Sequence, residues 1–283
     1  MKANPILSII IVSFNTKELL KQTINSIFKS EKNGNFYEII VVDNNSSDKS
    51  IEMVKKNFKK VKIIESQKNL GFAKANNLGA SHAKGKYLFF LNSDTIVKSG
   101  ALLQMIEFFE KNQNIGVLGP KLVLKSGRVQ PYCIGQKSSI SQAFKNRLAK
   151  LLFKLGFPKK SLARLSLEYW DWSKPIQVDW VTGAALMIKR KIFKKNRFDE
   201  NIFMYFEDQD LCLRVKKNGS EIWSLPNAKI IHLGGKSLKL DKARKKYYYQ
   251  SQDYFFKKHF GAFNYVVMKI ISFPIRMQIN LKR

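Results

Sequence analysis

The sequence is poor in several features that mark common protein classes. Its two cysteines, Cys133 and Cys212, belong to no metal-binding or redox motif and fit a reducing compartment. No apolar run reaches the ~18–20 residues that a membrane-spanning helix needs. The run from Ile6 to Phe14 is short for a secretory signal and lacks a cleavage-like ending, so we interpret it as a first strand. These features predict a cytoplasmic protein.

Two common phosphate-binding loops are also missing. No Gly-x-Gly-x-x-Gly motif follows the first predicted strand, and no Gly-Lys-Ser or Gly-Lys-Thr loop occurs. If the protein binds the phosphates of a nucleotide, a metal ion is therefore needed to neutralise them.

Acidic residues are scarce, with 21 against 51 lysines and arginines, and the formal net charge is +30. Such an excess favours a polyanionic partner: nucleic acid, an anionic membrane or a phosphorylated substrate. The alternative is a solvated surface in a lysine-rich proteome. With 283 residues, the chain can form one large domain, or one domain and an extension.

Apolar runs alternate with stretches of helical periodicity through the first 119 residues. Strands are predicted at 6–12, 38–42, 61–64, 86–91 and 115–118, and helices at 19–27, 51–58 and 102–110. This alternation predicts an α/β fold whose central sheet is mostly parallel and covered by helices. Further along, we expect a strand-like segment at 178–188, a helix at 207–217, short strands near Ile222 and Ile230, and a basic helical tail.

Polar clusters follow three of the predicted strands: Ser13 to Asn15, Asp43 to Asp48, and Asn92 to Asp94. The carboxyl ends of parallel strands share one edge of a sheet, where ligands bind. Asp43 can accept a hydrogen bond from a base or a ribose hydroxyl, and Asp94 can bind a hard cation. The alternative is that such residues only make turns and cap helices, which applies most to 45–47.

A second cluster combines four large apolar residues, 203–206, with the acids Glu207, Asp208 and Asp210 at the start of a predicted helix. Acids suit the first turn of any helix. Apolar surroundings raise a carboxyl pKa, whereas the helix N-terminus lowers it and keeps a general base ionised. The apolar run before the acids favours a catalytic role.

Of the three histidines, His232 is the candidate metal ligand. It ends a short apolar run and precedes Gly234-Gly235-Lys236-Ser237, whose groups suit a metal and phosphate oxygens. The alternative is a structural histidine, which is our interpretation of His82 and His259.

Taken together, these segments resemble glycosyltransferase family 2, and within it the rhamnosyltransferase-like bacterial enzymes with a GT-A fold. The matching segments are SIIIVSFNTKELL, IIVVDNNSSDKS, NLGFAKANNLGA, YLFFLNSDTIV, VTGAALMIKRKIF, FDENIFMYFEDQDLCLRVKKNG and IIHLGGKS, in family order from residue 6 to 237. The resemblance implies a Rossmann-like sheet with helices on both faces. It also implies that Ser13, Asn15 and Asp43 surround the base and ribose, while Gly71 and Asn76 line the nucleotide pocket.

The same resemblance implies the catalytic residues. Asn92-Ser93-Asp94 matches the Asp-x-Asp motif, with Asp94 and His232 binding Mg²⁺ or Mn²⁺. Asp208 is the implied general base, Glu207 supports it or contacts the acceptor, and Thr182-Gly183-Ala184 borders the donor sugar and acceptor. One departure is Asn92, which replaces the first aspartate and lowers the charge of the site by one.

The activity implied is inverting, metal-dependent transfer of a sugar by a single displacement. The donor is a nucleotide sugar, dTDP-rhamnose or a UDP-linked sugar, and the acceptor is a lipid-linked or cell-surface polysaccharide. The alternatives are a basic nucleic-acid-binding protein and an inactive glycosyltransferase-like scaffold. The former predicts stacking aromatics among the basic residues, but the aromatics here fall mainly in apolar runs.

We predict a glycosyltransferase domain at 1–237, with a nucleotide-sugar half at 1–119 and an acceptor half at 120–237, and a basic helical extension at 238–283. The segments 138–167 and 257–283 are basic and amphipathic. They suit an anionic membrane surface, so we expect a peripheral protein at the inner face of the cytoplasmic membrane. The alternative is that their apolar faces pack on the domain.

Overall fold

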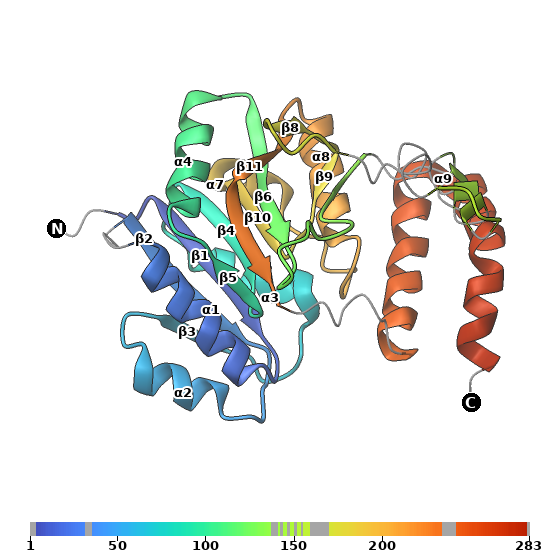
Figure 1. Ribbon diagram of the computed structural model, residues 1–283. Helices are drawn as coiled ribbons and strands as arrows, with labels where there is room; N and C mark the ends of the chain where they lie inside the picture. The colour runs from blue at the N-terminus through green and yellow to red at the C-terminus, as the bar shows by residue number, and fades with distance from the viewer. Residues whose placement is uncertain are drawn as a thin grey trace.

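A computed structural model describes residues 4–31, 36–136, 170–233 and 242–281, with isolated positions between 141 and 158. Its main sheet has the strand order β3-β2-β1-β4-β10-β6-β11-β5, with β8 added beside β11. Helices cover the sheet, and a helical pair at the C-terminal end stands beside it (Figure 1). Gly234 to Ser237 and most of the predicted basic segment 138–167 lie outside the described residues.

The first half of the chain forms the parallel part of the sheet. Its elements are β1 (Leu7–Ser13), α1 (Lys17–Ser30), β2 (Tyr37–Asp43), α2 (Ser50–Asn57), β3 (Lys62–Glu65), α3 (Gly71–Ser81) and β4 (Tyr87–Asn92). The strands β3, β2, β1 and β4 pair in parallel, as the alternating pattern predicts. Their register aligns Ser13 with Asp43 and Val12 with Asn92, so the polar ends of these strands reach the same edge.

The segment 95–232 adds strands of both directions. Its elements are β5 (Thr95–Val97), α4 (Ala101–Lys111), β6 (Ile115–Val123), β7 (Ile134–Gly135), β8 (Ile176–Gln177), β9 (Trp180–Val181), β10 (Ala185–Lys189), α7 (Arg190–Asn196), α8 (Glu207–Lys217) and β11 (Glu221–His232). Strand β10 is antiparallel to both β4 and β6, whereas β11 is parallel to β6 and antiparallel to β5. The prediction of a mostly parallel central sheet with helices on both faces is confirmed.

Two predicted elements of this segment have different boundaries in the structure. The strand-like run 178–188 is divided into β9 and β10 by the turn Thr182–Ala184. The two short strands expected near Ile222 and Ile230 form one strand, β11, whose register with β6 shifts between Leu225 and Lys229. Pro226 lies within this shift and has no N–H to donate, which explains the irregularity.

Strand β4 lies at the centre of the sheet, between β1 and β10. Its side chains from Tyr87 to Leu91 are buried, and the Tyr87 ring stacks on Phe109 of α4 with 5.0 Å between centroids. Burial on both faces explains why this strand is a continuous apolar run that becomes polar only where it leaves the sheet.

The C-terminal helix α9 (Lys242–Leu281) is interrupted at Gly261, whose backbone (φ 82°, ψ 174°) is not helical. The two halves lie side by side (Figure 1), and Arg276 of the second half pairs with Asp253 of the first at 2.7 Å. Within the described residues, no helix is both long and apolar enough to cross a bilayer.

Candidate active site

The ends of β1 and β4 are joined by a short chain of hydroxyl groups. Ser13 Oγ lies 3.0 Å from Thr16 Oγ1, and Thr16 Oγ1 donates to Ser93 Oγ at 2.9 Å. These contacts lie at the β1–β4 boundary, where the chain order in the sheet reverses. Open α/β sheets bind their ligands at such a boundary.

Asn15 and Asp43 order the loop that follows β2. Asn15 Oδ1 accepts a hydrogen bond from the Ser47 N–H at 2.8 Å, and Asp43 Oδ2 accepts from the Ser46 N–H at 2.8 Å. The other carboxylate oxygen of Asp43 is buried and has no hydrogen-bond partner. Asp43 and Ser66 are among the residues that line a cavity of about 330 Å³. A buried oxygen without a partner is costly, so Asp43 is well suited to accept from a ligand.

Gly71 marks the point where α3 meets the segment preceding α8. Its φ is +77°, and an added Cβ would lie 2.5 Å from the Phe203 ring and 2.6 Å from the Phe203 carbonyl oxygen. That same oxygen accepts from the Phe72 N–H at 2.7 Å. Glycine is therefore required by close packing as well as by its backbone conformation.

Asn76 and Asn77 both lie on α3 but have different partners. The Asn76 amide donates to the Phe72 carbonyl of its own helix at 3.0 Å, and the residue is 1% exposed. Asn77 bonds both the N–H and the C=O of Phe198, at 3.0 and 2.9 Å, and thereby holds the start of the segment leading to α8. The sequence analysis did not single out Asn77, because only the fold brings these residues together.

Asp94 and His232 are brought together by the pairing of β5 with β11. Their Oδ1 and Nε2 atoms are 3.0 Å apart, and Gln130 Oε1 lies 2.7 Å from His232 Nδ1. Gln130 and Asp94 thus hold the His232 ring at its two nitrogens. A carboxylate oxygen beside an imidazole nitrogen is a donor pair that fits a divalent cation.

The described residues contain no group of three or more His, Cys, Asp and Glu side chains arranged around one metal position. Asp94 and His232 would therefore hold a cation with two protein ligands. An oxygen and an imidazole nitrogen suit Mn²⁺ and leave coordination positions for phosphate oxygens or water.

The Asp208 carboxylate faces the turn between β9 and β10. Its Oδ2 accepts from the Gly183 N–H at 2.8 Å and its Oδ1 from the Gln209 N–H at 2.7 Å. Burial raises the pKa of Asp208, while these hydrogen bonds oppose the rise. A half-buried carboxylate with an elevated pKa is a better proton acceptor than an exposed aspartate.

Glu207 lies beside Asp208 in a more apolar position. It is buried, and its Oε2 atom has no hydrogen-bond partner. Burial and then the Asp208 charge raise the pKa of Glu207 well above its ordinary value. Two neighbouring buried carboxyls titrate as a pair, and burial raises the pKa of both, that of Glu207 more strongly.

The metal candidate and the base candidate are connected through the turn Thr182–Ala184. The Asn92 N–H donates to the Ala184 carbonyl at 3.0 Å, and the Gly183 N–H binds Asp208. A Cβ on Gly183 would lie 3.1 Å from the Phe72 ring and 3.5 Å from Glu207 Oε1. The turn therefore contacts β4, α3 and α8, and relates the strand carrying the Asn92-Ser93-Asp94 motif to the helix carrying Asp208.

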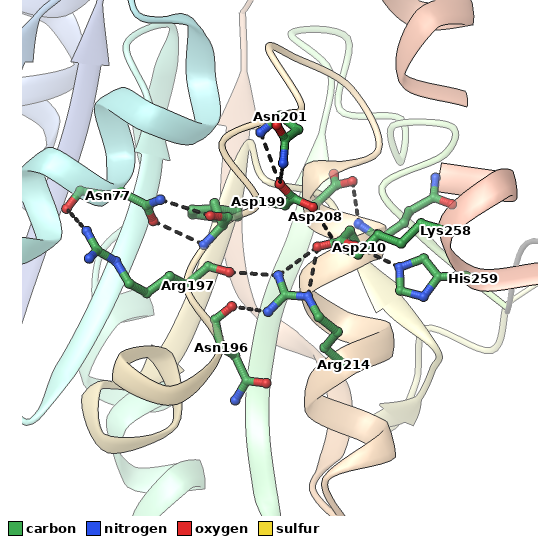
Figure 2. Close-up of polar contacts among 12 residues, drawn as sticks. Asn77, Asn196, Arg197, Asp199, Asn201, Asp208, Asp210, Arg214, Lys258 and His259 are labelled. Carbon is green, nitrogen blue, oxygen red and sulfur yellow. Dashed lines mark hydrogen bonds and ion pairs between the residues drawn. The ribbon is translucent and has the colours of Figure 1, made fainter. Parts of the chain in front are cut away.

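A buried ionic cluster fixes α8 behind the base, and the sequence analysis did not identify it. Asp210 contacts Arg214 at 2.6 Å, Lys258 at 2.6 Å and His259 at 2.7 Å, and Lys258 also contacts Asp199 at 2.6 Å (Figure 2). Burial raises the pKa of Asp210, but His259 and the two cations outweigh it and hold the pKa well below its usual range. His259 therefore makes a structural contact, in agreement with its interpretation as a structural histidine.

Aromatic packing reinforces this attachment of α9. The Phe203 ring stacks on Tyr247 at 4.6 Å, the Phe206 ring packs against Phe255 at 5.3 Å, and Ser251 Oγ donates to the Met204 carbonyl at 2.8 Å. The first half of α9 therefore contacts the whole apolar run that precedes Glu207. The backbones of Tyr205 and Phe206 have positive φ values of 67° and 66°, a strained conformation of a kind that recurs at functional sites.

The sheet order and the position of the polar edge agree with the Rossmann-like GT-A fold that the sequence predicts. The family model Glycosyl transferase family 2 matches residues 8–150, which is half of the chain. The chain belongs to this family and is a glycosyl-transferring enzyme.

Individual relatives agree with this assignment. The chain is 26% identical to the poly(ribitol-phosphate) β-N-acetylglucosaminyltransferase TarP of Staphylococcus aureus (strain N315), over 78% of this chain and 69% of TarP. It is 27% identical to the rhamnosyltransferase WbbL of Escherichia coli (strain K12), over 79% of this chain and 82% of WbbL. The crystal structure of GalNAc-T7 with UDP, GalNAc and Mn²⁺ shares the fold, with a TM-score of 0.63 and 16% identity over 90% of this chain and 50% of that one.

Proposed function

We propose that this protein is an inverting, metal-dependent glycosyltransferase that moves a sugar from a nucleotide-sugar donor to a glycan acceptor by a single displacement. Two observations carry the proposal: Asp94 and His232 form a close pair, and the turn Thr182–Ala184 binds both Asp208 and the backbone of Asn92, two residues before Asp94. The Asp94–His232 pair suits a cation, and Asp208 suits the role of proton acceptor. Family membership favours this function over nucleic-acid binding.

Asp208 is the general base in this proposal. It removes the proton from an acceptor hydroxyl while that oxygen attacks the anomeric carbon, on the face opposite the leaving nucleoside diphosphate. The Gly183 and Gln209 N–H groups orient its carboxylate, and the raised pKa of the buried Glu207 disfavours a second negative charge beside it. The retained base and metal candidates also favour an active enzyme over an inactive scaffold.

The donor pocket in this proposal lies along the polar edge of the sheet. Asp43, with its unpartnered oxygen, and Asn15 contact the base and ribose, while Ser13, Gly71 and Asn76 shape the pocket wall. Ser93 and Asn92 border the diphosphate. Thr182 and Gly183 border the transferred sugar.

Asp94 and His232 would hold Mg²⁺ or Mn²⁺, which, when bound, supplies positive charge to the leaving diphosphate. Gln130 fixes the imidazole ring through Nδ1 and so keeps Nε2 directed at the cation position. Because Asn92 replaces an aspartate, Asp94 is the main source of negative charge in this motif.

For the donor we propose a dTDP- or UDP-linked sugar, with dTDP-rhamnose favoured by the similarity to WbbL. For the acceptor we propose a lipid-linked or cell-surface polysaccharide, favoured by the poly(ribitol-phosphate) named for TarP. Such an acceptor places the enzyme at the inner face of the cytoplasmic membrane. In this proposal residues 1–119 bind the donor, 120–237 bind the acceptor, and 238–283 form a basic helical extension.

A thermal-shift panel of nucleotide sugars, each with and without Mn²⁺, tests this function. A ligand that binds only the native state stabilises it by RT ln(1 + [L]/Kd), so the melting temperature rises with ligand concentration. We expect one nucleotide sugar to stabilise the protein in a Mn²⁺-dependent manner. The proposal is wrong if no nucleotide sugar stabilises the protein under either condition.

A further inference from the structure

The second half of α9 has an apolar face directed away from the protein. Its exposed apolar side chains recur at helical spacing: Phe263, Val266, Ile270, Phe273 and Met277. Phe263 is 78% exposed, Ile270 68% and Phe273 58%. Isolated exposed apolar residues are ordinary, but a stripe of five along one helix marks a surface that another body covers.

The opposite face of this helical segment is already occupied. Met268 and Ser272 are buried, and Arg276 makes bidentate contacts with Asp253 at 2.7 and 2.9 Å. The segment therefore cannot hide its apolar stripe by rotating without breaking this ion pair and exposing Met268. The stripe is a stable feature of the fold.

The charge around the stripe identifies the kind of partner. From Tyr254 to Arg283 the sequence contains no aspartate or glutamate and six lysines and arginines. Lys257, Lys258 and Lys269 are exposed, while Lys258 and Arg276 pair with aspartates, and the whole chain has a net charge of +30. An apolar stripe flanked by basic groups fits an anionic lipid surface, to which each basic group near it adds about 1 kcal/mol of attraction. A second copy of this chain would bring like charge to the same face.

We propose that the stripe formed by Phe263, Val266, Ile270, Phe273 and Met277 docks on an anionic lipid bilayer, with α9 lying in the interface. The first half of α9 is held to the segment before Asp208 by Lys258, Phe255 and their partners. Docking of the stripe thus sets the base-carrying segment at a fixed position relative to the lipid surface. The docking itself does not depend on which reaction the enzyme catalyses.

Vesicle flotation with the full chain tests this proposal, and its readout is independent of activity. We expect the wild type to float with phosphatidylglycerol-containing vesicles at moderate salt, and to float much less with pure phosphatidylcholine. The double variant Ile270→Glu, Phe273→Glu should bind the anionic vesicles at least about tenfold more weakly, since it loses apolar contact and gains repulsion. The control Leu103→Glu alters an exposed leucine on α4, outside the stripe (42% exposed), and should float like the wild type.

A fluorescence measurement keeps the test decisive if the double variant folds poorly. Both native cysteines are buried, so Ile270→Cys and Leu103→Cys can each be labelled with an environment-sensitive dye. We expect anionic vesicles to shift the emission to the blue at position 270 and to leave it unchanged at 103. The proposal is overturned if the wild type does not float, if the double variant floats equally well, or if both labels respond alike. It is also overturned if sedimentation shows a dimer that the double variant dissociates while vesicles bind neither form.

Discussion

The Nε2 atom of His232 lies 3.0 Å from Oδ1 of Asp94, although 138 positions separate the two residues in the sequence. The antiparallel pairing of β5 with β11 aligns Thr95 with His232, and the Leu233 N–H donates to the Asp94 carbonyl at 2.7 Å. The proximity of these two side chains is therefore fixed by the backbone, and a bound cation would enter a preformed pair.

Removal of the Asp94 carboxylate should abolish the metal dependence of donor binding. We expect Asp94→Ala to lose the Mn²⁺-dependent rise in melting temperature.

Gln130→Ala, which frees the Nδ1 side of His232, should weaken metal affinity by about 10- to 100-fold, as changes to outer hydrogen-bond partners do. Isothermal titration with Mn²⁺ and the donor measures both effects. The control Glu107→Gln changes an exposed carboxylate on α4, and unchanged Mn²⁺ dependence in Asp94→Ala would contradict the metal assignment.

Gly71→Ala should destabilise the protein more than the same change at Gly127. Both glycines have positive φ, +77° and +81°, but a Cβ on Gly71 meets Phe203 while a Cβ on Gly127 meets nothing within 4 Å. The backbone term costs about 1–2 kcal/mol at either site, and the steric overlap at Gly71 adds about 1–3 kcal/mol. Denaturant unfolding measures the free energy of unfolding of both variants, and the difference between their losses reports the cost of the overlap with Phe203. Equal losses would show that this contact does not constrain α3.

Asp210→Asn should cause a large loss of stability, because it leaves Arg214, Lys258 and His259 facing a neutral group. Breaking a buried ion pair from one side costs about 3–5 kcal/mol. Glu65→Gln, which breaks the surface pair with Lys55 (59% and 52% exposed), should cost about 0–1 kcal/mol. Urea unfolding at neutral pH measures both values.

The same variant has a predicted pH dependence. The folded-state pKa of Asp210 is depressed, so its stabilising contribution is complete above the unfolded pKa of about 3.9 and declines as pH falls below it. The difference in stability between the wild type and Asp210→Asn should therefore shrink on acidification below about pH 4. A difference that stays constant down to the acid limit would contradict the ionic role of Asp210.

Glu207→Gln should behave in the opposite way. The folded-state pKa of Glu207 is raised, so its unfolded form ionises above about pH 4.3 while the folded form keeps its proton, and stability falls as pH rises through this range. The glutamine variant lacks this loss and should gain stability relative to the wild type as pH increases from 4 to 7. Thermal melts across this range measure the gain, and Glu107→Gln should show none.

Much of the fold follows from the local sequence pattern. The apolar runs and polar ends of β1, β2 and β4 predict the parallel half of the sheet and the edge on which the site lies, and the boundaries of α8 agree with the predicted helix 207–217. The family is confirmed by the family model. The pairing of Asp94 with His232 agrees with the placement that the resemblance implies, while their role as metal ligands stays a prediction.

The remaining features depend on contacts between distant segments. Two partners of Asp210, Lys258 and His259, come from α9, Asn77 binds the segment after α7, and the partner of His232 Nδ1 is Gln130. None of these side chains has a local signature, because an asparagine or aspartate in a helix has the same pattern whether its partner is water or a distant backbone. The antiparallel insertion of β10 between β4 and β6 is likewise set by tertiary packing.

The most direct test of the account is the transfer of radiolabelled sugar by Asp208→Asn beside the wild type. The substitution keeps the shape of the side chain and its place beside Gly183 but removes the capacity to accept the hydroxyl proton. We predict that donor affinity is unchanged while transfer falls by about 10²–10⁴-fold, the contribution typical of a general base. Transfer at the wild-type rate in Asp208→Asn, with donor binding intact, would contradict the assignment of Asp208 as the base.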